Sequence, residues 1–263
     1  MAYQTIITHE ADGILTITLN RPARRNALTA EMIAELTLAL EAAETSACGV
    51  VVLTGSGTAF CAGLDLAELQ AMNDKSAEEL EVDARRIARL FRVLYDLSKP
   101  TIASVNGHAI AGGTGLATLC DFTLAVPEAK FGYTEVKIGF VPAIVSVFLC
   151  MQVGEKIARD LLLTGRLFDA AEAQRLGLVT EVVAADELQA RVQALAAALL
   201  ANSPQSLKAT KQLLSEQNRA TLDEQIATAL AASAEARKHA DFREGVAAFL
   251  EKRKPVWSKD KAK

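Results

Sequence analysis

Apolar residues in the first half of the chain form short segments with the periodicity and length of β-strands. Residues 14–19 alternate apolar and polar side chains, which predicts a strand with one buried face. Residues 49–54 form a continuous apolar run, the kind that is buried on both faces of an α/β sheet. Residues 101–105 and 122–126 predict two more short strands. The first half therefore predicts a sheet of several strands.

Helical patterns separate these strands and dominate the chain after Pro142. Thr29 is a good N-cap, with Glu31 in the first turn, for a helix that runs to about Glu44. Later, residues 186–201 and 221–240 are Ala-rich and amphipathic, and Pro204 suits the first turn of a helix. We expect an α/β core domain over residues 1–200 and a helical C-terminal region over residues 201–263.

Composition and charge exclude several classes of protein. Of the 263 residues, 51% are hydrophobic and 23% are charged, so the chain can form a substantial core. A formal charge of −4 argues against nucleic-acid binding, although basic residues gather after residue 251. No run reaches the roughly 18 apolar residues of a membrane span, and the N-terminus lacks a signal-peptide pattern. We therefore expect a cytoplasmic protein with no membrane partner.

The cysteines and histidines are scattered along the chain. The 4 cysteines contain no CxxC pair, and the 3 histidines lie far from one another in the sequence. Zinc sites and disulfide frameworks need tighter spacing. We therefore expect no metal site.

Candidate chemistry begins with two glycine-containing loops, at residues 59–66 and 106–116. Each places glycine where a strand ends and a helix begins, and the first turn of a helix exposes unpaired N–H groups. Such donors suit a phosphate or a developing oxyanion. Neither loop has the lysine or spacing of a nucleotide fingerprint. Taken singly, each is typical of an ordinary turn, and only together do they suggest two donors directed at one oxygen.

Glu135 is the third candidate. It lies among apolar residues just before the helix that Pro142 begins. Apolar surroundings raise the pKa of a carboxyl group and suit it to proton transfer near neutral pH. Without further context, a solvated surface glutamate is the commoner outcome.

These segments, in this order, resemble the crotonase superfamily, which contains the enoyl-CoA hydratases and isomerases. The resemblance covers nearly the whole chain. The six segments that carry it are LNRPARRNALT (19–29), AFCAGLDL (59–66), VNGHAIAGGTGLATLCD (105–121), FGYTEVKIGFVP (131–142), LLLTGRLFDAAEAQRLGLV (161–179) and EGVAAFLEKRKPVW (244–257).

The resemblance implies a role for particular residues. The backbone N–H groups of Leu64 and Gly112 would form an oxyanion hole for the thioester carbonyl of an acyl-CoA, and Glu135 would move protons. Asp65 suits a structural role in holding its loop better than a catalytic one, whereas Tyr133 suits the core and a substrate contact equally well. The substrate and CoA contacts that the resemblance implies are Arg24 or Arg25, Ala62, Gly63, Asp65, Gly113, Gly115, Tyr133, Phe249 and Lys252.

One departure from the family pattern concerns the reaction. Hydratases of the family usually carry a glutamate in the second glycine loop, and here Gly115 stands at that position. Glu135 alone then serves either a hydro-lyase that adds water to a 2-enoyl-CoA or an isomerase that converts a 3-enoyl-CoA into a 2-enoyl-CoA. Residues 143–146 resemble those of enoyl-CoA and methylglutaconyl-CoA hydratases and favour hydration. A third hypothesis is a non-catalytic acyl-CoA binding protein.

The resemblance also implies a fold and an assembly. The expected fold is a spiral of ββα units in two sheets, followed by C-terminal helices that cover CoA and mediate oligomerisation. The expected assembly is a homotrimer or a dimer of trimers. No cofactor is expected beyond the coenzyme A of the substrate.

Overall fold

Two β-sheets organise the part of the chain that the computed structural model describes, which is residues 3–72 and 75–258. The last lysines of the basic C-terminus lie outside these ranges. In the larger, six-stranded sheet only β1 runs antiparallel to its neighbour. Its strands, in spatial order, are β1 (Ile6–Ala11), β2 (Ile14–Leu19), β3 (Val50–Gly55), β5 (Thr101–Val105), β7 (Phe122–Ala125) and β10 (Glu181–Val182).

The smaller sheet has four short strands, and each of the first three follows directly on a strand of the larger sheet. The pairs β3–β4, β5–β6 and β7–β8 therefore each contribute one strand to each sheet, with helices between the pairs. This is the expected spiral of ββα units. The strands of the smaller sheet, in spatial order, are β4 (Ala59–Cys61), β6 (His108–Ile110), β8 (Lys130–Gly132) and β9 (Phe168–Asp169).

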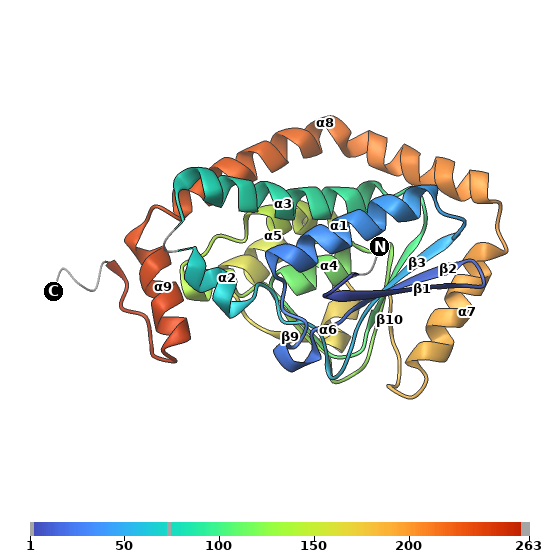
Figure 1. Cartoon of the computed structure of the whole chain (residues 1–263), viewed down its shortest axis with the longest axis horizontal. Coiled ribbons are helices and arrows are strands. Elements are labelled where there is room, and N and C mark those ends of the chain that lie inside the picture. The colour runs from blue at the N-terminus through green and yellow to red at the C-terminus, as the bar shows by residue number, and fades with distance from the viewer. Residues whose placement is uncertain (1–2, 73–74, 259–263) are drawn as a thin grey trace.

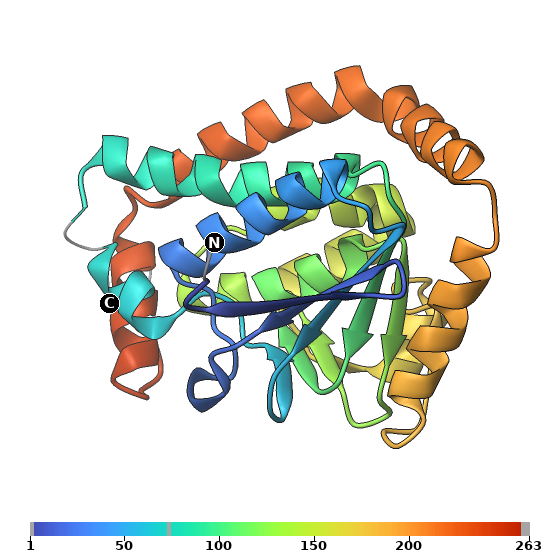
Figure 2. The same ribbon diagram turned by 45° about the vertical axis from the view of Figure 1, so that its right-hand side comes forward.

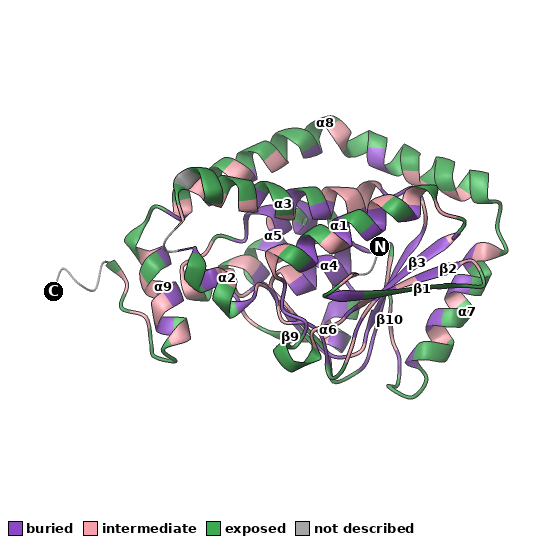
Figure 3. Cartoon of the chain, viewed as in Figure 1, coloured by how far each residue is buried: buried purple, intermediate pink, exposed green. Residues whose placement is uncertain are grey.

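Helices from the first two-thirds of the chain pack on these sheets, and their inner faces join the strands in the buried core (Figure 3). The first begins where the sequence predicts, because the Thr29 hydroxyl accepts a hydrogen bond from the Met32 amide at 3.1 Å. These helices are α1 (Ala30–Thr45), α2 (Leu66–Ala71), α3 (Ala77–Asp96), α4 (Gly112–Leu119), α5 (Ala143–Thr164) and α6 (Ala170–Arg175). Two short 3-10 helices without buried residues, η1 (Pro22–Arg24) and η2 (Glu135–Ile138), precede α1 and α5 in the chain.

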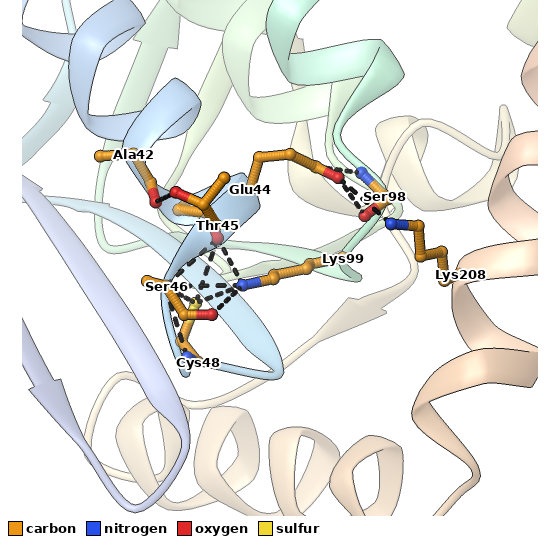
Figure 4. A network of polar contacts seen from close by, with 9 residues as sticks. Ala42, Glu44, Thr45, Ser46, Cys48, Ser98, Lys99 and Lys208 are labelled. Carbon is orange, nitrogen blue, oxygen red and sulfur yellow. Dashed lines mark hydrogen bonds and ion pairs between the residues drawn. The ribbon is translucent and has the colours of Figure 1, made fainter.

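A polar network fixes the C-terminus of α1 (Figure 4). The Lys99 ammonium donates to the carbonyl oxygens of Ala43 and Ser46. Its positive charge also interacts favourably with the negative, C-terminal end of the helix dipole. Glu44 accepts from both the amide and the hydroxyl of Ser98, at 3.0 and 2.6 Å. The segment just before β5 is thus tied to the end of α1.

Three helices form the C-terminal part of the chain: α7 (Leu188–Leu200), α8 (Pro204–Ala236) and α9 (Ala240–Leu250). The amphipathic stretch predicted at residues 221–240 belongs mostly to α8, a single helix of 33 residues. In Figures 1 and 2, α8 crosses over α3, and α9 lies beside α2. None of the helices in the described ranges is long and apolar enough to cross a membrane.

Candidate active site

The three candidate segments of the sequence all follow strands of the smaller sheet. The loop of Ala62–Leu64 follows β4, Gly112 lies just after β6, and Glu135 lies just after β8. Because β4, β6 and β8 are parallel neighbours, their carboxyl ends meet at one edge of the sheet. The strand order therefore brings together residues that are up to 73 positions apart.

Two glycines let the first two loops pack backbone against backbone. Gly63 has a φ of +83°, and a Cβ there would lie 2.9 Å from the carbonyl oxygen of Ile110. A Cβ on Gly113 would lie 2.3 Å from the carbonyl oxygen of Cys61. No side chain larger than hydrogen fits at these contacts without movement of the backbone. Gly63 and Gly113 therefore allow the backbones of the two loops to lie in direct contact.

The amides of Leu64 and Gly112 both have no hydrogen-bond acceptor within the described ranges. The two neighbours of Leu64 both bond to Leu28: the Gly63 carbonyl accepts from the Leu28 amide at 2.8 Å, and the Asp65 amide donates to the Leu28 carbonyl at 2.9 Å. The Leu64 amide takes no part in these bonds. Gly112 is the first residue of α4, where a helix leaves its N–H groups unpaired. Both residues line a cavity of about 560 Å³, so two free donors are available at its wall.

Glu135 lines the same cavity as the first residue of η2. The residue as a whole is partly exposed, but its Oε2 atom is enclosed and has no hydrogen-bond partner among the described residues. Burial raises the pKa of this carboxyl to about 7. Among the described residues that line the cavity, Glu135 is the sole carboxylate. Near neutral pH it can both accept and donate a proton.

Apolar side chains fill the space beside Gly115. A Cβ at this position would lie 2.7 Å from Phe91 Cε1 and 2.8 Å from Val145 Cγ1, and both side chains line the cavity. The chain therefore lacks the room as well as the residue for a carboxylate at this point of α4.

We expect Gly115→Glu to destabilise the protein by more than about 3 kcal/mol, because it combines overpacking with a buried, unpaired charge. Gly115→Ala, with overpacking alone, should cost about 1–3 kcal/mol. Urea unfolding of both variants tests this, with Gly112→Ala as the control, since its Cβ would meet Leu28 Cδ1 at an ordinary 3.5 Å. A Gly115→Glu protein as stable as the wild type would contradict the packing at this site.

The structure places five of the predicted site residues at the cavity and leaves the others away from its wall. Those at the wall are Ala62, Leu64, Gly112, Glu135 and Phe249. Those away from it are Arg24, Arg25, Gly63, Asp65, Gly113, Gly115, Tyr133 and Lys252.

Two of the residues away from the wall have clear structural roles. Tyr133 is 1% exposed, and its hydroxyl lies 3.2 Å from that of Thr118 within the core. Asp65 caps α2 by accepting from the Ala67 amide, and it pairs with Arg21 at 2.8 Å. Burial alone would raise the pKa of Asp65, but these two hydrogen bonds hold it below its ordinary value. Asp65 therefore fixes the loop that carries Leu64.

Two arginines that the sequence did not indicate, Arg237 and Arg253, line the cavity. Arg253 forms ion pairs with Glu244 and Glu251, both at 2.5 Å. Arg237 lies one turn after Ser233 on the buried side of α8, a position that helical periodicity could have marked. No three His, Cys, Asp or Glu side chains in the described part of the chain converge as metal ligands would.

Comparison with known proteins identifies the family of the chain. The model of the enoyl-CoA hydratase/isomerase family matches residues 9–261. A relative from Thermus thermophilus is 46% identical over 248 residues, which cover 94% of this chain and 98% of that protein. The 2,3-dehydroadipyl-CoA hydratase of Escherichia coli is 36% identical over 258 residues, covering 95% and 97%. The crystal structure of an enoyl-CoA hydratase/isomerase from Xanthobacter autotrophicus superimposes with a TM-score of 0.88 at 32% identity, covering 96% and 98%.

The fold, the cavity and these similarities together define an enzyme of the crotonase superfamily. The chain belongs to the enoyl-CoA hydratase/isomerase family.

Proposed function

We propose that this enzyme adds water to the double bond of a 2-enoyl-CoA thioester and that Glu135 is its single catalytic acid and base. The observation that carries the proposal is the enclosed, unpartnered Oε2 of Glu135 in a cavity that also presents the free amides of Leu64 and Gly112. These amides would hold the thioester oxygen, where negative charge develops.

The proposed reaction needs one carboxylate and one water molecule. Ionised Glu135 accepts a proton from water as the water oxygen bonds to Cβ of the substrate. The electrons of the double bond move toward the thioester oxygen, and the two amides stabilise the resulting enolate. Glu135 then gives the proton to Cα, which completes the addition of H₂O and restores the ionised carboxylate. Coenzyme A enters as part of the substrate, and no other cofactor takes part.

Isomerisation is the second candidate, because the lack of a second carboxylate also suits it. Glu135 would remove a proton from C2 of a 3-enoyl-CoA and return it to C4. The names of the relatives favour hydration, including the hydratase from Escherichia coli. A binding protein without catalysis is the third candidate, which the position and raised pKa of Glu135 argue against.

Mass-resolved products from a panel of 2-enoyl- and 3-enoyl-CoA thioesters separate these candidates. A gain of one water from a 2-enoyl-CoA is the expected result. Rearrangement of a 3-enoyl-CoA without a change of mass would assign the isomerase. Complete inertness toward the panel, with the thioesters still bound, would favour the binding protein.

The proposed base predicts the pH dependence of the reaction. Since ionised Glu135 starts the hydration, kcat/KM should rise about tenfold per pH unit below about pH 7 and level off above it. Initial rates on one 2-enoyl-CoA between pH 5.5 and pH 8.5 measure this. Activity that falls as the pH rises through 7 would assign the protonated carboxyl as the starting form instead.

CoA placement and assembly complete the proposal. Arg24 and Arg25, exposed after β2, would lie near the CoA phosphates, and Phe249 would contact CoA from α9. Leu163, Leu213 and Leu214 are large apolar side chains that are more than half exposed, which favours oligomerisation. The family resemblance leads us to propose a homotrimer or a dimer of trimers. The location we propose is the cytoplasm.

A further inference from the structure

Arg237 is a buried arginine at the wall of the active-site cavity. It is 5% exposed and follows the last residue of α8, a helix that passes over α3 (Figure 1). A charged side chain with so little exposure is normally paired with an opposite charge. The contacts of Arg237 therefore indicate whether its own chain supplies that partner.

The protein satisfies Arg237 only in part. Nη1 donates to the carbonyl oxygen of Leu80 at 2.6 Å, and Cζ lies 5.1 Å from the centroid of the Phe140 ring. The Nε atom is enclosed without a hydrogen-bond partner, and the guanidinium forms no ion pair with any described carboxylate. The charge of Asp83 acts on Arg237 without pairing with it, and Asp83 already pairs with Lys75 at 2.6 Å and with Arg86 at 3.1 Å.

Ser233 adds a second donor at the same part of the cavity. It lies one helical turn before Arg237, is 4% exposed, lines the cavity, and its hydroxyl has no hydrogen-bond partner among the described residues. The surrounding wall is apolar, with Leu69, Ala84 and Ile87 from α2 and α3. An arginine and a hydroxyl in an apolar enclosure form a site that a carboxylate would complete.

We propose that Arg237, with Ser233, binds a carboxylate carried by the acyl group of the substrate, so that the preferred substrates are acyl-CoA thioesters with a carboxylate at the far end of the acyl chain. This inference rests on the proposed function for the identity of the cavity as the acyl site. A CoA phosphate could supply the same negative charge. The near-complete burial of Arg237 favours the acyl carboxylate, because the phosphates of CoA are bulky and strongly hydrated.

Binding of saturated thioesters tests the inference without turnover. Calorimetric titration would compare saturated acyl-CoA thioesters of four to eight carbons that end in a carboxylate, in its methyl ester, or in a methyl group. We expect the wild type to bind at least one carboxylate-ended thioester about 10- to 100-fold more tightly than its methyl ester, since a hydrogen bond to a charged group changes the affinity by about this factor. Equal affinities at every chain length would overturn the inference.

Variants assign the preference to Arg237. Arg237→Gln should remove the preference for the carboxylate, and Arg237→Lys should retain part of it. Arg243→Gln, on the exposed face of α9 and away from the cavity, should keep the wild-type ratio. Equal weakening of all three kinds of thioester by Arg237→Gln would show that Arg237 binds a CoA phosphate or stabilises the fold. Either result would overturn the inference.

The two proposals fail separately. Binding that discriminates the carboxylate, together with the absence of water addition to any 2-enoyl-CoA, would refute the proposed function and leave the carboxylate site supported. Hydration without discrimination between the thioesters would refute the carboxylate site alone.

Discussion

Replacing Glu135 with glutamine should lower kcat for hydration of a 2-enoyl-CoA by about 10²–10⁴-fold, with little change in KM. Glutamine keeps the size and shape of the side chain but can neither accept the proton of water nor deliver one to Cα. Glu135 is the sole carboxylate that the described residues place at the cavity, so no neighbour can take over its role. Initial rates on the thioester that the wild type turns over best measure the effect.

The control for this loss is the stability of the variant. The pKa of Glu135 is about 7 in the folded protein against an ordinary value of 4.5, so the folded state binds the proton more tightly than the unfolded state. The stability that protonation contributes is lost as the pH rises from about 4.5 to about 7. At pH 8, Glu135→Gln should therefore be more stable than the wild type by up to about 3 kcal/mol.

A folded, more stable and inactive variant would confirm that the loss is chemical. Glu128→Gln is a matched control, because Glu128 is exposed and lies away from the cavity. Full activity of Glu135→Gln would end the assignment of Glu135 as the acid and base.

Replacing Gly112 with proline should lower kcat by about 10²–10³-fold, because it removes one of the two proposed oxyanion donors. Gly112 is the first residue of α4, where proline suits the helix itself, but a proline here would also restrict Ala111, whose φ is 52° and ψ is −122°. The substitution removes the N–H group at the position where the helix needs it least. Steady-state kinetics on the same thioester, with circular dichroism as a check on folding, give the measurement.

Gly112→Ala separates the lost donor from the added side chain. Alanine keeps the N–H group, and its Cβ would meet Leu28 Cδ1 at 3.5 Å, an ordinary van der Waals distance. We expect the proline variant to be at least about tenfold slower than the alanine variant. Equal rates for the two would show that the Gly112 amide does not stabilise the transition state.

Several elements could be predicted from the sequence because local chemistry determines them. The strand of Thr101–Val105 has the expected bounds, and α1 begins after Thr29 because a hydroxyl there caps the helix. The C-terminal helices were harder to predict. Most of the expected helix at residues 221–240 is the end of α8, which runs from Pro204 to Ala236. The part between Pro204 and residue 221 was missed because the polar residues of an exposed helix show no strong apolar period.

The position of Arg237 shows what periodicity alone leaves open. Leu222, Ala229 and Ser233 are buried along one side of α8, and Arg237 continues that side. A helical pattern predicts which residues share a side, but an arginine at its end usually extends into solvent. Only the packing of α8 over α3 encloses the guanidinium at the cavity.

From the sequence we predicted the strands β2, β3, β5 and β7, the starts of α1 and α8, and the residues of the three candidate segments, because each depends on neighbours within a few positions of the chain. The family resemblance came from six such segments in a fixed order. Only the tertiary structure decided that Leu64, Gly112 and Glu135 share one cavity, that Phe91 and Val145 fill the space beside Gly115, and that Tyr133 lies in the core. These facts depend on the order of β4, β6 and β8 in the smaller sheet and on contacts between residues far apart in the chain.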